Sequence, residues 1–362
     1  MKENLKLGFG LMRLPMNGDE VDIAQCKEMT DRFLKAGFTY FDTAYFYLDE
    51  KSEPAAREMV VSRYPRDSFT LATKMPIYAV GSEEDVDKFF ATQLERTGAG
   101  YFDYYLLHAV NGGTYEDKVK RFGIWPKLLE KKKQGLIRHI GFSFHDSPEV
   151  LDKILTELPE AEFVQLQINY LDWNSENVRS RECYEIARAH GKEIVIMEPI
   201  RGGALAALSP EIRAKMPGGR EPAAEALRFA ASLDGVIAVL SGMSLLEQAE
   251  QNIVTLGEGF TPIDESEKEA LLSIAEEIRA IPRIPCTRCK YCTEVCPQKL
   301  PIHKIIGAVN EYRVYHQNHY RWAVGDGPKA SDCLGCGACE SNCPQKLPIR
   351  EAMKEAEETF EK

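Results

Sequence analysis

The stretch Cys286-Thr-Arg-Cys289-Lys-Tyr-Cys292-Thr-Glu-Val-Cys296-Pro297 determines the fold of the last quarter of this 362-residue chain. The same cysteine spacing returns in a second run at Cys333, Cys336, Cys339 and Cys343, again followed by proline. The sequence Cys-Pro-Gln-Lys-Leu-Pro-Ile closes both runs without a change. Eight of the ten cysteines belong to this duplication, which indicates a small domain built around two equivalent cysteine-rich sites.

The spacing of each run is C-x2-C-x2-C-x3-C-P, which is typical of bacterial two-cluster ferredoxins. It predicts two [4Fe–4S] clusters, in which the fourth cysteine of each run ligates the cluster of the other run. The first cluster would then be held by Cys286, Cys289, Cys292 and Cys343, and the second by Cys333, Cys336, Cys339 and Cys296. Zinc is the alternative, because C-x2-C pairs also bind zinc, but zinc ribbons use two separated cysteine pairs. Disulfides are less favoured, because we expect the chain to be cytosolic.

The composition is that of an ordinary soluble protein, with 44% hydrophobic and 28% charged residues. No apolar run approaches the length of a membrane span, and the start MKENLKLGFG has no apolar signal core. We therefore expect a cytoplasmic protein without a membrane segment. The net charge of −11 argues against a nucleic-acid partner, because phosphate-binding surfaces need clustered basic residues.

Strand-like and helix-like segments alternate along the first 262 residues. Candidate strands cover residues 6–10, 39–43, 69–74, 104–108, 137–143, 163–167, 193–198 and 236–241. Amphipathic helical stretches cover residues 23–36, 54–63, 83–97, 115–134, 148–157, 176–190, 221–232 and 245–256. Eight such repeats predict an α/β fold, a (β/α)8 TIM barrel. A doubly wound sheet is the alternative, but no G-x-G-x-x-G follows the first strand.

The predicted organisation has three parts. Residues 1–262 form the barrel, residues 263–283 form a linking helix, and residues 284–362 form a small α-helical ferredoxin-like domain with two clusters. Prolines at positions 282 and 285 end the linking helix. The insert between the two cysteine runs, residues 303–332, is aromatic and basic, and we expect it to pack over the clusters or onto the barrel.

Four polar residues stand where predicted strands end. Asp42, Lys74 and His108 are each the last or nearly last residue of a strand, and Tyr47 follows five residues after Asp42. Catalytic groups of (β/α)8 barrels lie at this C-terminal edge. Lys74 paired with Asp42 would lower the pKa of the Tyr47 phenol, which could then exchange a proton with a carbonyl oxygen. The plainer alternative is a structural ion pair that closes the top of the barrel.

These residues lie in segments that resemble the aldo-keto reductase family. The segments are Gly37-Phe-Thr-Tyr-Phe-Asp42-Thr-Ala-Tyr-Phe-Tyr47, Leu71-Ala-Thr-Lys74, Asp103-Tyr-Tyr-Leu-Leu-His108, Ile140-Gly-Phe-Ser143, Phe163-Val-Gln165, Glu198-Pro-Ile-Arg-Gly-Gly203 and Ser241-Gly-Met-Ser244. The resemblance continues from Gln248 to Asn252 and spans about residues 5–256. A barrel of this family followed by a ferredoxin-like tail resembles its iron–sulfur branch.

The resemblance implies a catalytic set and a cofactor. Tyr47 would be the general acid, tuned by Lys74 and Asp42, and His108 would orient the substrate carbonyl. NAD(H) or NADP(H) would bind across the barrel mouth, with a small carbonyl or alcohol compound as the substrate. The implied cofactor-binding residues are Ser143 and Gln165 at the nicotinamide carboxamide, Gly203 and Ser241 in the loops after the last two strands, and Gly242, Met243, Ser244, Gln248 and Asn252 at the adenosine end.

The sequence departs from the family pattern near several of these positions. Leu48 and Asp49 follow Tyr47 where a glycine is usual, and Glu198 stands where many relatives have an aromatic residue that stacks on nicotinamide. Phe144 replaces an asparagine. Gln248 stands where NADP-preferring relatives have an arginine, which favours NAD.

The two halves of the chain handle electrons differently. Nicotinamide transfers a hydride, two electrons at once, whereas each cluster passes one electron. Flavin could mediate between them, although no motif signals it. Two hypotheses follow. The first is an NAD(P)H-dependent carbonyl reductase or alcohol dehydrogenase with accessory clusters. The second is an electron-transfer or redox-sensing protein with a redox partner protein, in which the barrel is a scaffold.

Overall fold

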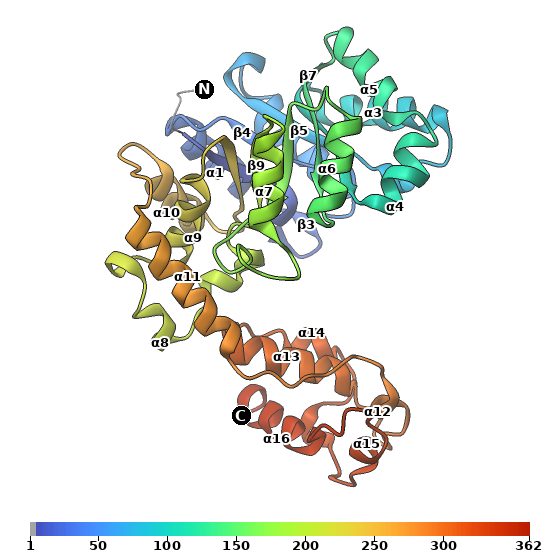
Figure 1. Ribbon diagram of the computed structural model, residues 1–362, viewed down its shortest axis with the longest axis vertical. Helices are drawn as coiled ribbons and strands as arrows, with labels where there is room; N and C mark the ends of the chain where they lie inside the picture. The colour runs from blue at the N-terminus through green and yellow to red at the C-terminus, as the bar shows by residue number, and fades with distance from the viewer. Residues whose placement is uncertain (1–4) are drawn as a thin grey trace. The chain divides into compact units, whose positions relative to one another are not determined.

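The computed structural model describes residues 5–362, so the first four residues of the N-terminal segment lie outside it. Eight parallel strands close into a barrel, in the order β1-β10-β9-β8-β7-β6-β5-β4 (Figure 1). The strands are β1 Leu7–Gly10, β4 Tyr40–Asp42, β5 Thr70–Met75, β6 Phe102–Val110, β7 Ile137–Phe144, β8 Phe163–Gln167, β9 Glu193–Met197 and β10 Val236–Gly242. Pairing of β1 with both β4 and β10 completes the ring. The predicted TIM barrel is confirmed.

Helices follow the strands, as the alternation predicted. They are α1 Ile23–Lys35, α2 Ser52–Ala56, α3 Glu83–Thr97, α5 Ile124–Lys133, α6 Pro148–Glu157, α7 Ser180–Ala189, α9 Pro222–Ala231 and α10 Leu246–Leu256. Local signals set their starts: Ser82 and Asp85 form a capping box before α3, and Ser147 caps α6 with Pro148 in its first turn. Short elements that the sequence did not predict include the hairpin of β2 Met16–Asn17 and β3 Glu20–Val21 and the short helices α4 Gly112–Thr114 and α8 Pro210–Arg213.

The interior of the barrel is filled by side chains from β4, β5, β6, β8, β9 and β10. These side chains are Tyr40, Ala72, Tyr104, Leu106, Phe163, Val195, Ala238 and Leu240. Gly141 on β7 shows how tight this packing is, because a Cβ there would lie 2.2 Å from the carbonyl oxygen of Phe163. The interior of the barrel is therefore a packed core.

The segment predicted as one helix over residues 115–134 is two elements. A π-helical turn covers Tyr115–Lys120, and α5 begins only at Ile124. Between them Gly123 has φ +57, a left-handed conformation that interrupts the helix. The amphipathic period continues across the break, which is why the pattern alone did not reveal it.

The chain divides into two compact units. The first holds residues up to Gly202 together with Ala223–Glu269, and the second holds Gly203–Pro222 and Ala270–Lys362. Helix α11, Glu265–Ala280, begins in the first unit and continues in the second. The predicted linking helix therefore exists, whereas the domain boundary near residues 281–285 stays a prediction.

The second unit is helical, as expected for its cysteine-rich part. Its helices are α12 Tyr291–Glu294, α13 Ile302–Tyr315, α14 Tyr320–Val324, α15 Ala338–Ser341 and α16 Ile349–Phe360. The insert between the cysteine runs forms α13 and α14, and Tyr320 stacks on Phe360 with ring centroids 4.8 Å apart. In the described part of the chain, no helix is both long enough and apolar enough to cross a bilayer.

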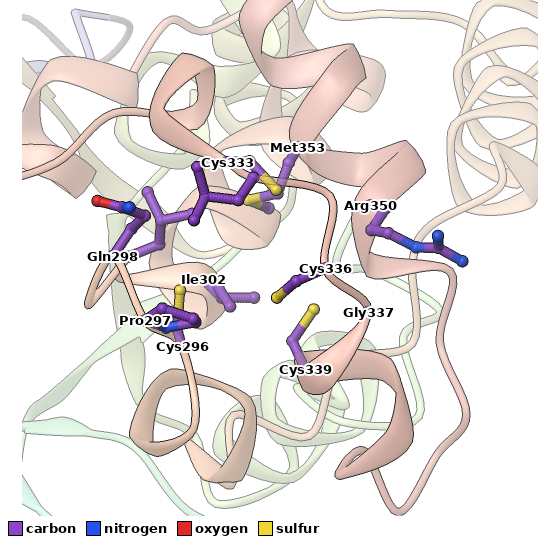
Figure 2. A pocket seen from close by; sticks show the side chains of 12 residues that line it. Cys296, Pro297, Gln298, Ile302, Cys333, Cys336, Gly337, Cys339, Arg350 and Met353 are labelled. Carbon is purple, nitrogen blue, oxygen red and sulfur yellow. The ribbon is translucent and has the colours of Figure 1, made fainter.

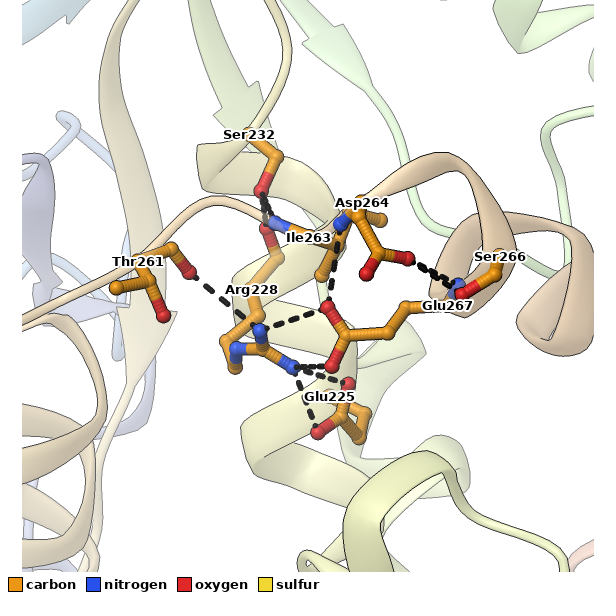
Figure 3. Close-up of polar contacts among 8 residues, drawn as sticks. All are labelled: Glu225, Arg228, Ser232, Thr261, Ile263, Asp264, Ser266 and Glu267. Atoms are coloured by element: carbon orange, nitrogen blue, oxygen red, sulfur yellow. Dashed lines mark hydrogen bonds and ion pairs between the residues drawn. The ribbon is translucent and has the colours of Figure 1, made fainter.

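A buried ion network ties α9 to the first turn of α11 (Figure 3). The Arg228 guanidinium donates to both carboxylate oxygens of Glu225, at 3.0 and 2.9 Å, and to Glu267 at 3.0 Å. Glu225 is fully buried and Arg228 nearly so. Each charge therefore needs the others, since a lone buried charge is strongly unfavourable.

Candidate active site and cysteine-lined sites

A buried ion pair between Lys74 and Asp42 lies at the centre of the candidate site. The two residues are on the neighbouring parallel strands β5 and β4, near their C-terminal ends. Nζ of Lys74 donates to Oδ1 of Asp42 over 2.5 Å and to the carbonyl oxygen of Thr43 over 2.8 Å. Burial by itself lowers the pKa of Lys74, but Asp42 and Tyr47 more than offset this and raise it. The ammonium therefore stays charged.

Tyr47 lies beside this pair. Nζ of Lys74 is 4.9 Å from the centroid of the Tyr47 ring. Burial raises the pKa of the phenol above its ordinary value of 10.0, and the charge of Lys74 opposes this only in part. The expectation of a lowered pKa is therefore right for the Lys74 interaction and wrong for the net effect. The site holds Tyr47 as a neutral phenol, which is the form that donates a proton.

His108 completes the group. Its ring centroid lies 5.8 Å from that of Tyr47 in an edge-to-face arrangement. Burial, followed by the charge of Lys74, lowers the pKa of His108 from 6.5 to about 3, so the imidazole is neutral. Its Nδ1 atom is buried and has no hydrogen-bond partner among the described residues. The structure thus brings Asp42, Tyr47, Lys74 and His108 together.

The backbone around His108 is irregular. The register between β6 and β7 shifts between Leu107 and Val110, and Ala109 has φ +57. Ser143 holds this bulge, because its Oγ accepts from the Ala109 amide at 2.8 Å and donates to the Leu107 carbonyl at 3.5 Å. Bulges beside active sites re-aim a side chain. Ser143 therefore holds the backbone on both sides of His108, a contact that the sequence did not suggest.

Gln165 lies next to Ser143 across the β7–β8 ladder. Its Nε2 donates to the sulfur of Met197 at 3.6 Å, whereas its Oε1 is buried without a partner in residues 5–362. A buried acceptor without a donor is unfavourable until a ligand supplies one. The amide group of a nicotinamide carboxamide is such a donor, so these residues fit the cofactor that the resemblance implies.

The residues expected at the adenosine end play structural roles in this state. Nδ2 of Asn252 donates to Oγ of Ser241 at 3.0 Å, and both are buried. Oε1 of Gln248 accepts from the amides of Ser244 and Leu245, which caps α10. Two further residues lie in this loop, Gly242 at its exposed start and Met243 buried behind it. Gly203 begins the segment that belongs to the second unit.

Three residues outside the predicted catalytic and cofactor-binding sets lie close to the site. Tyr78 follows β5, and its ring centroid is 5.9 Å from that of His108. The Glu198 carboxylate also raises the pKa of Tyr47, and Glu198 itself has φ +55. Arg13 packs its stem along Gly242. The aromatic loop after β5 was the only signal for Tyr78, and no pattern pointed to Arg13.

The loop after Tyr47 has an unusual conformation. Leu48, Asp49 and Glu50 have φ of +53, +52 and +70, three successive residues in the left-handed region. Glycine adopts this region without penalty, which explains why a glycine is usual here. The loop therefore keeps a glycine-like path although this chain supplies larger residues.

The eight cysteines of the two runs line two separate cavities in the second unit. One cavity is lined by Cys296, Cys333, Cys336 and Cys339, and the other by Cys286, Cys289, Cys292 and Cys343. Figure 2 shows the first of them, with the sulfur of Cys296 on the opposite side from those of Cys336 and Cys339. The grouping is the crossed one that the ferredoxin spacing predicts.

The geometry of the thiols suits a cluster better than a single ion. A zinc ion requires ligands about 2.3 Å from the metal, so the four sulfurs must converge on one point. Across residues 5–362, no three cysteine, histidine or acidic side chains converge in this way. Each group of four thiols instead lines a cavity.

Comparison with known proteins agrees with both halves of the molecule. The aldo/keto reductase family profile matches residues 6–274, and that of the 4Fe-4S dicluster domain matches residues 285–347. The chain therefore belongs to the aldo/keto reductase family. It is an oxidoreductase of that family with a 4Fe-4S dicluster domain, and the resemblance stated from the sequence is confirmed.

Individual relatives are distant. An uncharacterized oxidoreductase of Schizosaccharomyces pombe is 26% identical over 73% of this chain and 87% of its own length. An aldo-keto reductase of Mycolicibacterium vanbaalenii is 29% identical over 65% of this chain and 78% of its own. The solved aldo-keto reductase AKR11C1 of Bacillus halodurans has a TM-score of 0.61 at 23% identity, covering 74% of this chain and 91% of that one. At that identity the likeness concerns the fold alone.

Proposed function

We propose that this protein is an NAD(P)H-dependent oxidoreductase that interconverts a carbonyl compound and an alcohol, with Tyr47 as the general acid and base. The observation that carries the proposal is the buried Lys74–Asp42 pair, at 2.5 Å, beside Tyr47 and a neutral His108. A structural ion pair alone would not require a phenol and an imidazole with an unpaired nitrogen at the same place.

In this proposal each side chain has a separate task. Tyr47 donates its phenolic proton to the carbonyl oxygen, and the positive charge of Lys74 stabilises the phenolate that remains. Asp42 keeps Lys74 charged and fixed. His108, neutral at physiological pH, donates a hydrogen bond from one ring nitrogen to the substrate oxygen and so orients the carbonyl.

The fit of Gln165 and the family both support NAD(P)H as the cofactor. When bound, NAD(P)H supplies the hydride. Gln165 would accept a hydrogen bond from the carboxamide of the cofactor. Contact with the cofactor at the adenosine end would require that the present contacts there break; the residues concerned are Ser241, Gly242, Ser244, Gln248 and Asn252. A solved aldo-keto reductase of Klebsiella pneumoniae, 17% identical with a TM-score of 0.62, is described in complex with NADPH. The absence of an arginine at position 248 favours NADH in this chain.

Substitution of Tyr47 by phenylalanine tests the proposal. The Tyr47→Phe variant should lose about 10²–10⁴-fold in kcat for NAD(P)H-dependent carbonyl reduction, the usual contribution of general acid catalysis. Its cofactor dissociation constant, measured by quenching of nicotinamide fluorescence, should not change. Tyr78→Phe, which removes a neighbouring phenol, is the matched control and should keep its activity. Full turnover by Tyr47→Phe would disprove the assignment.

We further propose that the two cysteine-lined cavities each hold one [4Fe–4S] cluster. The four thiols around each cavity support this count. The thiols must stay reduced to act as ligands, which suits the cytoplasm as the location. Iron, sulfide, flavin and nucleotide analysis of one anaerobically purified sample tests the cofactor content, with about eight iron atoms expected per chain.

The second candidate function is electron transfer or redox sensing, in which the barrel is a scaffold. Its support is the pair of cysteine-lined cavities, which the carbonyl chemistry does not require. An anaerobic visible spectrum separates the two candidates. Bleaching of the cluster absorbance by NADH would show that the halves exchange electrons, which calls for a flavin between them, whereas bleaching by dithionite alone would place the clusters outside the hydride chemistry.

A further inference from the structure

The two cysteine runs share one backbone path but differ between their cysteines. In the second run, Gly335 and Gly337 have φ of +64 and +78. In the first run, Arg288 and Lys290 occupy the matching positions with φ of +57 and +71. Glycine takes this left-handed conformation without penalty, whereas residues with a Cβ do not. The second run thus shows that glycine fits, and yet the first run has two strained, charged residues.

The positive charges in and just after the first run are free at the surface. Arg288, Lys290 and Lys304 are all exposed, and none of them forms an ion pair within the part of the chain that the structure describes. Arg288 lies against α13 near Lys304, because its Nη2 atom is 3.7 Å from the position of a Cβ at Gly307, one turn further along that helix. All three charges also act on His303, whose pKa is lowered first by burial and then by them. They therefore form one group, which we call the basic surface.

The basic surface lies beside the cavity of the first run. The cavity of the first run is lined in part by Cys289 and Lys290, and Cys289 is exposed. Tyr291, with half of its side chain exposed, adds an apolar group beside them. At the second cavity the lining arginine, Arg350, is paired with Glu340 at 2.9 Å, and Gly335 and Gly337 stand at the positions of Arg288 and Lys290.

We propose that the basic surface of Arg288, Lys290 and Lys304 docks an acidic one-electron carrier protein over the cluster of Cys286, Cys289, Cys292 and Cys343. This proposal rests on the proposed presence of that cluster. One electron passes between the carrier and the cluster, so that one is oxidised and the other reduced by one electron, with no proton transferred.

Charge favours this occupant. The chain as a whole carries −11, so an acidic partner is repelled by most of its surface and attracted only where positive charges gather. Charge complementarity mainly accelerates encounter, and it does so most at low salt. Each cavity has one exposed thiol, Cys289 in the first and Cys336 in the second, so charge directs the carrier to the first cavity.

The test replaces the two strained residues with those of the second run. The Arg288→Gly/Lys290→Gly variant should fold at least as well as the parent, because both positions already have glycine geometry. The matched control, Arg321→Gln/Lys354→Gln, removes the same charge from exposed positions elsewhere in the second unit. Both variants keep all eight cysteines of the two runs.

The probe is an acidic flavodoxin, mixed anaerobically in a stopped-flow instrument with the reduced chain. The second-order rate of electron transfer should fall by about tenfold or more in the glycine variant at ~0.01 M salt and stay near the parent value in the control. At ~1 M salt all three proteins should react alike. Equal rates for the parent and glycine variant at low salt, or an equal fall in the control, would overturn the proposal.

A second measurement separates this proposal from that of the clusters. Titration calorimetry of the same flavodoxin against each protein reports docking without electron transfer. If iron analysis finds no cluster, weaker binding to the glycine variant alone still supports the docking surface, whereas unchanged binding refutes it. Stronger competition by a short duplex DNA than by flavodoxin would also overturn the proposal, in favour of a nucleic-acid partner.

Discussion

At the scale of single residues, the Lys74–Asp42 pair is a buried charge pair with one Asp42 oxygen, Oδ2, left without a partner in the described chain. Removal of the cation alone should lower the stability of the barrel. The Lys74→Met variant leaves the Asp42 carboxylate buried and uncompensated, and the barrel should lose about 3–5 kcal/mol of stability. The Asp42→Asn/Lys74→Met variant removes both charges and should recover most of this loss.

Tryptophan fluorescence during denaturation measures this effect on the barrel. Trp125 and Trp173 are buried in the first unit, whereas Trp322 in the second is 91% exposed and changes little on unfolding. The signal therefore reports the barrel even if the two units unfold separately. Equal stability of Lys74→Met and the parent would mean that Asp42 takes up a proton when its partner is removed.

His108 predicts a pH dependence of stability. The folded protein holds its pKa at about 3, against an ordinary value of 6.5, so between these pH values only the unfolded chain binds the proton. Stability should therefore fall as the pH falls from about 6.5 toward 3, by at most about 1.4 kcal/mol per pH unit from this group. The His108→Gln variant should show a shallower acid limb, and denaturation midpoints across that range measure the difference.

The shifted pKa values of His108 and Tyr47 also predict how the reaction rate depends on pH. Because His108 is neutral and the pKa of Tyr47 is raised, neither group changes its charge between about pH 5 and 8. The kcat/KM for carbonyl reduction should be flat over this range. An inflection near pH 6.5 that disappears in His108→Gln would show that the imidazole is charged during turnover.

At the scale of elements, the bulge in β6 is expected to govern the placement of His108. Ser143→Ala removes both hydrogen bonds that hold the Ala109 bulge. We expect kcat to fall by about tenfold or more, with a smaller change in the cofactor dissociation constant. The reason is that the imidazole is displaced, whereas the cofactor pocket is not. Ser143→Thr, which keeps the hydroxyl, should restore activity. Cofactor binding lost in proportion to kcat would instead support the direct carboxamide contact.

The elements that sequence patterns predicted are those governed by local signals. Helices α3 and α6 begin and end where their caps and periodicity placed them. The extension of β6 past His108 was not predictable, because a bulge leaves no periodic trace and depends on a hydroxyl supplied by β7. The net pKa of Tyr47 was missed for a related reason. The sequence showed the nearby cation, whereas the burial that outweighs it is a property of the folded site.

At the scale of the whole molecule, the crossed ligand sets are the feature that depends on the longest sequence separation. Cys296 lines a cavity with cysteines that are 37 or more positions away, and Cys343 does the same in the opposite direction. Each cluster would therefore tie the two cysteine runs together. Neither run could then hold a complete cluster alone.

A set of three proteins tests the crossing. The first protein is a triple variant with Cys333→Ala, Cys336→Ala and Cys339→Ala. It lacks three ligands of one cavity and should keep about four iron atoms in the other. Addition of Cys296→Ala should change nothing further, because that thiol belongs to the cavity already lost. Addition of Cys343→Ala should remove the fourth ligand of the surviving cluster and lower its iron content.

Iron and sulfide analysis, together with electron paramagnetic resonance of the reduced samples, distinguishes the two pairings. Crossed ligation predicts that only the Cys343→Ala addition alters the remaining signal. If each run instead held its own cluster, the Cys296→Ala addition would be the damaging one and Cys343→Ala would be silent. The two additions differ only in which run loses its last cysteine, so each is the control for the other, and a general weakening of the fold would affect both alike.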